Sequence, residues 1–142
     1  MNESPEVKWN VANSVWLKDM DGLELDPEFA ETVIAYYRAE VWKSNFDQGT
    51  VDDINSWVNT NTDGMIDEVI QNISPNTMMY LINAISFDGE WEEQYEDDKI
   101  KEGFDFNNAD GSISSVTMLS SKENRYFTLG DGEGFVKPYK NR

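Results

Sequence analysis

The first third of the chain changes from a two-residue to a helical period of apolar positions. Val7–Leu17 is rich in Val and Trp and alternates roughly every second residue, which predicts a β-strand. Asp19–Gly22 then has the composition of a turn. Asp26 and Pro27 suit the N-cap and first position of a helix. The apolar face of this helix consists of Phe29, Val33, Ile34, Tyr36 and Tyr37.

A short strand at Glu40–Phe46 and a second helix are predicted next. Thr50 and Asp53 form a capping-box-like pair at the start of this helix. Its buried stripe consists of Val51, Ile54, Trp57 and Val58. Gly64 ends or bends the helix, and Pro75 ends any helix that follows. Between them lies a shorter apolar face, formed by Met65, Ile66, Val69 and Ile70.

Thr77–Phe87 (TMMYLINAISF) is the most apolar run of the chain. The preceding proline, the lack of polar periodicity and the turn residues Asp88 and Gly89 favour a strand that is buried on both faces. Asn83 lies inside this run. A buried asparagine has to be hydrogen-bonded, because each unsatisfied group costs about 1–3 kcal/mol.

The remaining residues alternate between short apolar segments and turns. Strands are predicted at Phe104–Phe106, Ser115–Leu119, Arg125–Leu129 and Gly134–Tyr139. Turns are predicted at Asp110–Gly111 and Asp131–Gly132. Strands and helices in this order, without an internal repeat or a low-complexity linker, predict an α+β fold.

The composition excludes several classes of function but does not identify one. With 28 Asp+Glu against 11 Lys+Arg, the formal net charge is −17, which argues against nucleic acid and anionic membranes as partners. The absence of Cys and His excludes thiolate and imidazole chemistry. Met1–Lys8 is polar and mixed in charge, so it does not resemble a signal peptide. On these physical grounds the compartment stays open.

Acidic and amide side chains offer two candidate cation sites, and we favour a structural explanation for both. Five residues copy positions one, three, five, six and eight of a calcium loop: Asn59, Asn61, Asp63, Gly64 and Ile66. Ile70 stands where the bidentate Glu is required, so a helix end with a left-handed glycine is the better interpretation. The acidic run Glu90–Asp98 is best explained as a solvated segment. No metal, no cofactor and no enzymatic activity are therefore predicted.

Three groups of residues go beyond generic patterning. They are Ile54-Asn55-Ser56-Trp57-Val58, Thr62-Asp63-Gly64-Met65-Ile66, and Asn83-Ala84-Ile85-Ser86-Phe87-Asp88-Gly89-Glu90-Trp91 with Tyr95. In this order and at these separations they resemble the serpin family of serine protease inhibitors. Its pattern is Ile-Asn-x-Trp-Val, Thr-x-Gly-x-Ile, and Asn-Ala-x-x-Phe-x-Gly-x-Trp with an aromatic residue four positions later. Supporting matches lie at Val11–Trp16, Tyr36–Val41, Asp110–Ser112 and Pro138–Tyr139.

The resemblance implies a partial α+β serpin fold over residues 1–142. Val7–Leu17, Glu40–Phe46 and Thr77–Phe87 would be strands 2, 1 and 3 of sheet A, followed by parts of sheets B and C. The two helices would be helices E and F, with Thr50–Thr62 as helix F lying across sheet A. Helix F would pack on the sheet through Ile54, Asn55, Trp57, Val58, Thr62, Gly64 and Ile66. The region where sheet A opens for loop insertion would include Asn83, Phe87, Gly89 and Trp91.

The resemblance also implies inhibition by a conformational trap. A protease cleaves an exposed reactive loop, which then inserts into sheet A beside strand 3 and carries the acyl-enzyme with it. A serine or cysteine protease is thus the expected partner of a full-length protein, in an extracellular setting. No segment up to Arg142 resembles the reactive loop, its hinge or strand 5 of sheet A. We therefore expect a middle fragment that does not trap a protease by itself.

Other interpretations stay open at this point. A non-inhibitory serpin relative that binds or chaperones other molecules would differ only in the loop hinge. An unrelated acidic module that binds calcium or carbohydrate would be separated by a calcium titration. Because strand 3 would lie at an uncovered sheet edge, we also expect self-association of the fragment.

Overall fold

The computed structural model describes residues 7–140 of the chain. The chain divides into two compact units. The N-terminal unit is Lys8–Asp88, and the described part of the C-terminal unit is residue 7 together with residues 89–140. The prediction of a single incomplete domain stays a prediction. Most of the segment considered as a signal peptide lies outside the described residues. Among the described residues, none of the helices is long and apolar enough to cross a membrane.

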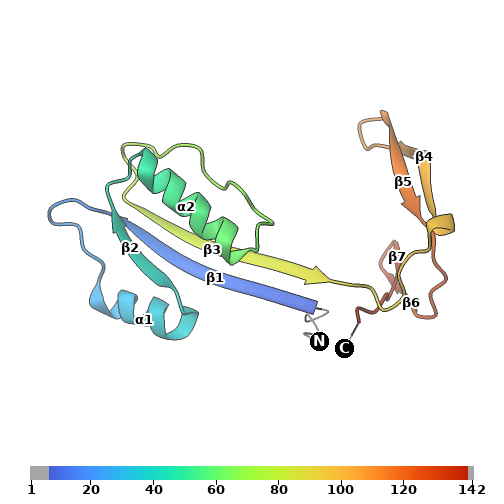
Figure 1. The fold of residues 1–142 in the computed structure, drawn as a ribbon, viewed down its shortest axis with the longest axis horizontal. Helices are drawn as coiled ribbons and strands as arrows, with labels where there is room; N and C mark the ends of the chain where they lie inside the picture. The colour runs from blue at the N-terminus through green and yellow to red at the C-terminus, as the bar shows by residue number, and fades with distance from the viewer. Residues whose placement is uncertain (1–6, 141–142) are drawn as a thin grey trace. The chain divides into compact units, whose positions relative to one another are not determined.

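The elements of the N-terminal unit alternate between strands and helices (Figure 1). In chain order they are β1 (Val7–Lys18), α1 (Pro27–Tyr37), β2 (Glu40–Ser44), α2 (Gln48–Asn61) and β3 (Met79–Gly89). The C-terminal unit contains a short 3₁₀ helix at Asp97–Lys99 and four strands: β4 (Ile100–Asn107), β5 (Ile113–Leu119), β6 (Tyr126–Leu129) and β7 (Gly132–Phe135). The predicted α+β class is confirmed.

The N-terminal sheet has the strand order β2-β1-β3. β1 and β2 are parallel, with Ser14 opposite Glu40. β3 runs the other way (Figure 1): the Lys18 amide donates to the Met78 carbonyl at 3.0 Å, and Asn83 further along β3 contacts Asn13, earlier in β1. β1 is therefore the central strand, and β2 and β3 are the two edges.

The two helices use opposite faces of this sheet. Trp16 and Ala84 belong to a buried cluster with Ile54, Trp57 and Val58 of α2. The neighbouring strand residue Val15 is buried instead with Val33 of α1 and with Ala39. Successive side chains of a strand point to opposite faces, so Val15 packs against α1 and Trp16 packs against α2.

Both helices begin at acidic N-caps. The Asp26 carboxylate accepts from the amides of Glu28 and Phe29 at 2.9 and 3.1 Å, with Pro27 at the first position, as predicted. For α2 the predicted pair Thr50–Asp53 is wrong, because the helix begins earlier at Gln48. Asp47 caps it by accepting from the Thr50 amide at 3.1 Å.

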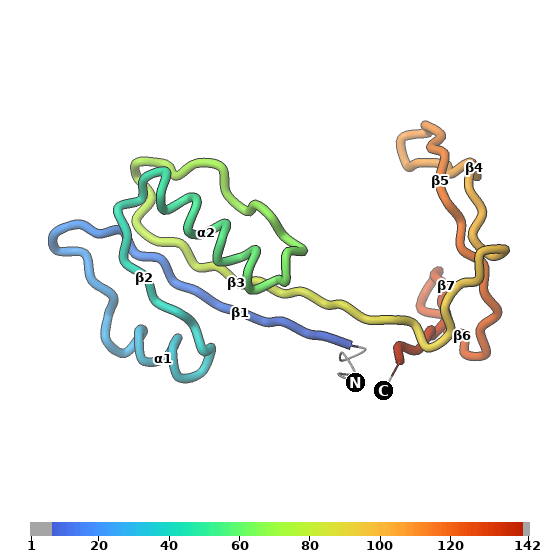
Figure 2. Tube along the Cα trace, viewed as in Figure 1, coloured from blue at the N-terminus to red at the C-terminus, as the bar shows by residue number. Residues whose placement is uncertain are grey.

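The apolar face predicted after α2 is not helical. Asn55 of α2 holds this segment: its side-chain oxygen accepts from the amides of Val69 and Ile70 at 2.9 and 3.2 Å, and its amide donates to the Ile70 carbonyl at 2.8 Å. Figure 2 shows the segment running back beside the helix. These side-chain bonds replace the bonds that a further helix would supply.

The prediction that β3 is buried on both faces is wrong. Ala84 and Ser86, on the α2 side, are buried, whereas Leu81 and Ile85 on the other side are 63% and 54% exposed. Asn83 shares this exposed face and is hydrogen-bonded rather than buried. α2 covers one face only, and no other segment of Lys8–Asp88 covers Leu81 and Ile85 to the same extent.

The C-terminal unit consists of two antiparallel hairpins. β4 and β5 pair from Ile100 opposite Leu119 to Asn107 opposite Ile113. The Ser112 amide donates to the Asp110 carboxylate at 2.9 Å in the turn between them, as predicted. β6 and β7 form the second hairpin, but β7 ends at Phe135 rather than at the predicted Tyr139.

Candidate functional site

The first part of the candidate site is the contact of α2 with the sheet. Ile54 is fully buried, and Trp57 and Val58 pack with it against Trp16 and Ala84. Trp57 and Val58 follow Ile54 by three and four residues, so a single stripe meets the flat face of the sheet. This stripe fixes the position of α2 over β1 and β3.

Polar residues of the Thr62–Ile66 motif fix the segment that follows α2. Thr62 is completely buried, and its hydroxyl donates to the Val58 carbonyl at 2.8 Å and accepts from the Ile66 amide at 3.2 Å. Gly64 adopts φ +79°, which favours glycine. Its amide donates to the Asn59 carbonyl at 2.8 Å, so the chain turns back sharply after the helix.

Asp63 links this turn to both long strands. Its carboxylate accepts from the Lys8 ammonium and from the Asn10 amide of β1. Asn10 also donates to the Ser86 hydroxyl of β3 at 3.1 Å. The hydrogen bond from Lys8, followed by that from Asn10, holds the pKa of Asp63 below its usual value. We call Lys8, Asn10, Asp63 and Ser86 the Asp63 latch.

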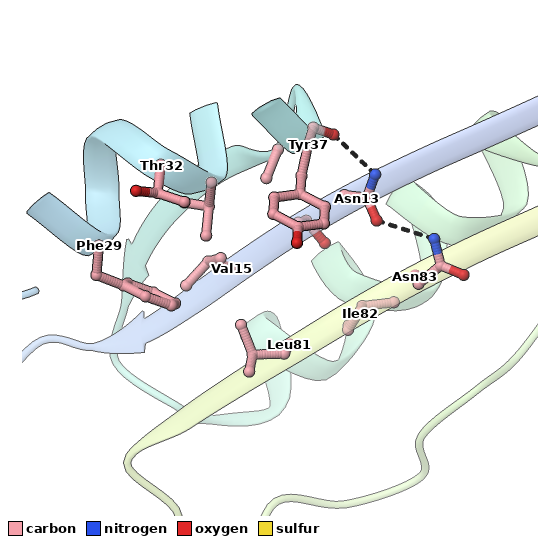
Figure 3. Close-up of a pocket in the computed structure, with 11 residues that line it drawn as sticks. Asn13, Val15, Phe29, Thr32, Tyr37, Leu81, Ile82 and Asn83 are labelled. Atoms are coloured by element: carbon pink, nitrogen blue, oxygen red, sulfur yellow. Dashed lines mark hydrogen bonds between the residues drawn. The ribbon is translucent and has the colours of Figure 1, made fainter. Parts of the chain in front are cut away.

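The opposite face of the sheet carries a chain of amides (Figure 3). The Asn83 amide donates to the Asn13 side-chain oxygen at 2.8 Å, and the Asn13 amide donates to the Tyr37 carbonyl at 2.8 Å. This chain borders an open pocket of about 440 Å³ between α1, β1 and β3. Its apolar lining includes Phe29 and Leu81. Asn83 thus connects β3 to β1 and, through Asn13, to the end of α1.

The four residues predicted for the sheet-opening region are divided between the two units. Asn83 and Phe87 lie on β3 in the N-terminal unit, where Phe87 contacts Trp9 edge-to-face at 4.7 Å. Gly89, the last residue of β3, and Trp91 belong to the C-terminal unit.

The contacts around Trp91 were not predicted from the sequence. Its ring stacks on Tyr139 at 4.2 Å. The Lys137 ammonium lies 6.0 Å from the Trp91 ring centre, 4.4 Å from that of Tyr95, and 3.0 Å from the Glu123 carboxylate. Lys137 and Glu123 are 14 residues apart in sequence, so no local pattern indicated this pair.

The Lys137–Glu123 pair is largely withdrawn from solvent. The two side chains are only 6% and 11% exposed. A hydrogen bond from Ser121, followed by that from Lys137, lowers the pKa of Glu123, so the carboxylate stays ionised opposite the ammonium. Breaking a partly buried pair of this kind costs free energy, because the remaining charge is left unpaired. The pair therefore helps to hold the Lys137 ammonium near the aromatic rings of Trp91 and Tyr95.

The side chains of the calcium-like motif take part in other contacts. The amide of Asn59 donates to Asp67, that of Asn61 to the Trp57 carbonyl, and Asp63 belongs to the latch. Within residues 7–140, no group of three His, Cys, Asp or Glu side chains is placed to hold a metal ion. In the acidic run, Glu90 pairs with Lys140 at 2.7 Å.

Comparison with known proteins gives one consistent match. The family model of serpins (serine protease inhibitors) matches residues 1–137. Serpin-ZX of Arabidopsis thaliana is 31% identical over 130 residues, and Serpin-Z7 of Hordeum vulgare is 30% identical over 147 residues. These alignments cover 88% and 99% of this chain but only 32% and 36% of the relatives. The chain thus spans about a third of their length.

Solved structures agree with the sequence match. The thermophilic serpin tengpin in its native state is 40% identical, with a TM-score of 0.87 over 97% of this chain and 35% of its own. Arabidopsis AtSerpin1 in its native stressed conformation is 25% identical, with a TM-score of 0.78 over 94% of this chain and 35% of its own. An antiparallel β3 beside β1, roofed by α2, is accordingly part of a serpin fold.

The chain belongs to the serpin family. β2, β1 and β3 are strands 1, 2 and 3 of sheet A, and α1 and α2 are helices E and F. Members of this family are mostly protease inhibitors.

Proposed function

We propose that this chain supplies the strand-accepting part of sheet A in a serpin that inhibits a serine protease. The observation that carries the proposal is the position of β3. Its inner edge is held by β1, one face is roofed by α2, and it forms an edge of the three-stranded sheet. An edge strand can accept a further strand through its free backbone groups.

The contacts around β3 suit this role. The Asn13–Asn83 amide pair and the Asp63 latch both tie β3 to β1, on opposite faces of the sheet. An inserted strand would therefore extend the sheet without displacing β3 from β1. In this proposal Asn83 and Phe87 belong to the region that the loop enters. Gly89 and Trp91 follow at the end of β3, with Trp91 fixed by Tyr139 and Lys137.

A longer serpin that contains this chain and the 142-residue chain alone would behave differently. A full-length serpin containing this chain would act outside the cell on a serine or cysteine protease and would change conformation when the loop inserts. The chain by itself, in which no segment resembles a reactive loop, would leave proteases active. We also propose that the chain alone self-associates through its exposed sheet edges.

A chimera tests the inhibitory role. Residues 1–137 replace the matching segment of a plant serpin that forms an SDS-stable complex with a serine protease, and the unmodified serpin is the control. We expect the folded chimera to form the same complex, because its sheet A accepts the loop. A chimera that folds, shown by a cooperative thermal transition, but is cleaved without complex formation would overturn the proposal.

The companion experiment uses the 142-residue chain at molar excess over the same protease. Protease activity should be unchanged, and no band of higher mass should appear on a denaturing gel. A covalent complex with the chain alone would contradict the second part of the proposal.

A further inference from the structure

The two edges of the N-terminal sheet differ in how they are protected. β2 is five residues long and carries Glu40 and Lys43, with Lys43 paired to Asp19 at 3.3 Å. β3 is 11 residues long and has no charged residue and no proline between Met79 and Phe87. Charges, prolines and short length are the features that prevent edge strands from pairing with other chains. Between Met79 and Phe87, the β3 edge has none of these features.

The register of β3 on β1 determines which backbone groups face outward. The Lys18 amide donates to the Met78 carbonyl, so even-numbered residues of β3 are those that bond to β1 in an antiparallel ladder. The backbone N–H and C=O groups of the odd-numbered residues then point away from β1. In the middle of the strand these are Leu81, Asn83 and Ile85.

We infer that the 142-residue chain forms a dimer in which the outer edge of β3 pairs antiparallel with the same edge of a second copy, about a two-fold axis at Asn83. A self-pairing edge in a closed dimer has to obey two-fold symmetry. With the axis at Asn83, Leu81 lies opposite Ile85 of the second copy, and Ile85 lies opposite its Leu81. The side chains of both, 63% and 54% exposed, share one face of the sheet.

This register is favoured over its neighbours by the side chains it pairs. It places two aliphatic residues opposite each other twice and Asn83 opposite Asn83. A shift of the axis to Ala84 or to Ile82 would place Asn83 opposite Ile85 or opposite Leu81. Favourable cross-strand side-chain pairs stabilise a sheet by roughly 0.2–1 kcal/mol each. The register centred on Asn83 is therefore the most stable of the three.

The net charge of the chain opposes dimer formation and makes the dimer's stability depend on salt. Two chains of formal charge −17 repel each other, while the pairing edge itself is neutral. Salt screens this repulsion, with a Debye length of about 30 Å at 0.01 M and about 3 Å at 1 M. Association should therefore strengthen as NaCl is raised, the opposite of an interface held by ion pairs.

Cysteine substitution tests the register directly, because the chain has no cysteine of its own. Asn83→Cys should form a disulfide dimer under mild oxidation, since directly opposed residues have Cα atoms about 5.5 Å apart. Leu81→Cys and Ile85→Cys should each fail to cross-link alone, because four residues of strand separate each from its twin by about 13 Å. An equimolar mixture of the two should cross-link.

The mixture keeps Asn83 in place, so it tests the register even if Asn83→Cys does not fold. Ser115→Cys, on the uncharged strand β5 of the other unit, is the matched control and should stay reduced. Sedimentation velocity of the unmodified chain should show dimer that increases with protein and NaCl concentration. A monomer under all conditions, or cross-linking by Ser115→Cys instead, would overturn the inference. The pairing rests on the self-association proposed above and not on the inhibitory role, so its failure would leave the result of the protease-complex experiment unchanged.

Discussion

Asp63 combines a strained backbone position with a charge that ties three segments together. It has φ +53°, a left-handed conformation that Asp and Asn tolerate better than other non-glycine residues. Asp63→Asn therefore keeps the turn and removes the charge opposite Lys8. We expect a lower melting temperature at pH 7, because the ion pair and the strong hydrogen bond from Asn10 are weakened.

The pH dependence of this difference has a definite sign. The pKa of Asp63 is lowered from 3.8 in the folded chain, so its contribution is complete above the unfolded value and disappears as pH falls through the folded value. The melting temperatures of Asp63→Asn and the unmodified chain should converge in acid. Asp53→Asn, at an exposed carboxylate of α2, is the control. A gap that stays constant down to pH 3 would contradict the latch.

Single residues were predictable from sequence where a motif gave them a local partner. The Thr62 hydroxyl bonds within four residues on either side, and Gly64 ends the helix through its own backbone. Lys137 and Glu123 had no such signal, since the β6–β7 hairpin lies between them in sequence and has to form before they meet. Asn83 was recognised, but its exposed position depends on which elements cover the sheet.

At the scale of elements, α2 depends on its N-cap as well as on its apolar stripe. Asp47→Ala removes the side chain that accepts from the Thr50 amide, and we expect a loss of about 1 kcal/mol. The midpoint of urea unfolding, followed by tryptophan fluorescence, measures this loss because Trp16 of β1 and Trp57 of α2 are buried where the helix packs on the sheet. Asp53→Ala should have a much smaller effect, although it also removes a carboxylate from the first turns. Equal losses for both variants would show that charge, rather than the cap, is responsible.

The elements also show that local sequence patterns predict where a helix or strand begins better than they predict which of its faces is buried. α1, β1 and the Asp26 cap follow from neighbouring residues and were predicted. The start of α2 was missed by one turn because Asp47 and Thr50 are both capable caps, and only the fold determines which one acts. Met65–Ile70 has a helical spacing of apolar residues, but Asn55, more than ten positions away, binds its backbone instead. The exposed face of β3 could not be foreseen, because burial depends on what packs there.

For the whole molecule, the dominant global feature is its charge. A formal charge of −17 produces self-repulsion that destabilises compact states. Glu92 and Glu93 are exposed members of the acidic run, and neither takes part in an ion pair among the described residues. The double variant Glu92→Gln/Glu93→Gln should therefore raise the melting temperature at about 20 mM NaCl. A gain of a few tenths of a kcal/mol corresponds to about 1–3 °C for a chain of this size.

Salt separates this long-range effect from any local one. At about 1 M NaCl the screening length falls to roughly 3 Å, so the double variant and the unmodified chain should melt together. Lys101→Gln, which removes an exposed positive charge from the same unit, should shift the melting temperature in the opposite direction at low salt. The melting temperatures should be measured at low protein concentration, where dimerisation through β3 does not add stability by mass action. A gain that persists at high salt would mean that Glu92 and Glu93 act through local contacts, because screening removes only the long-range repulsion.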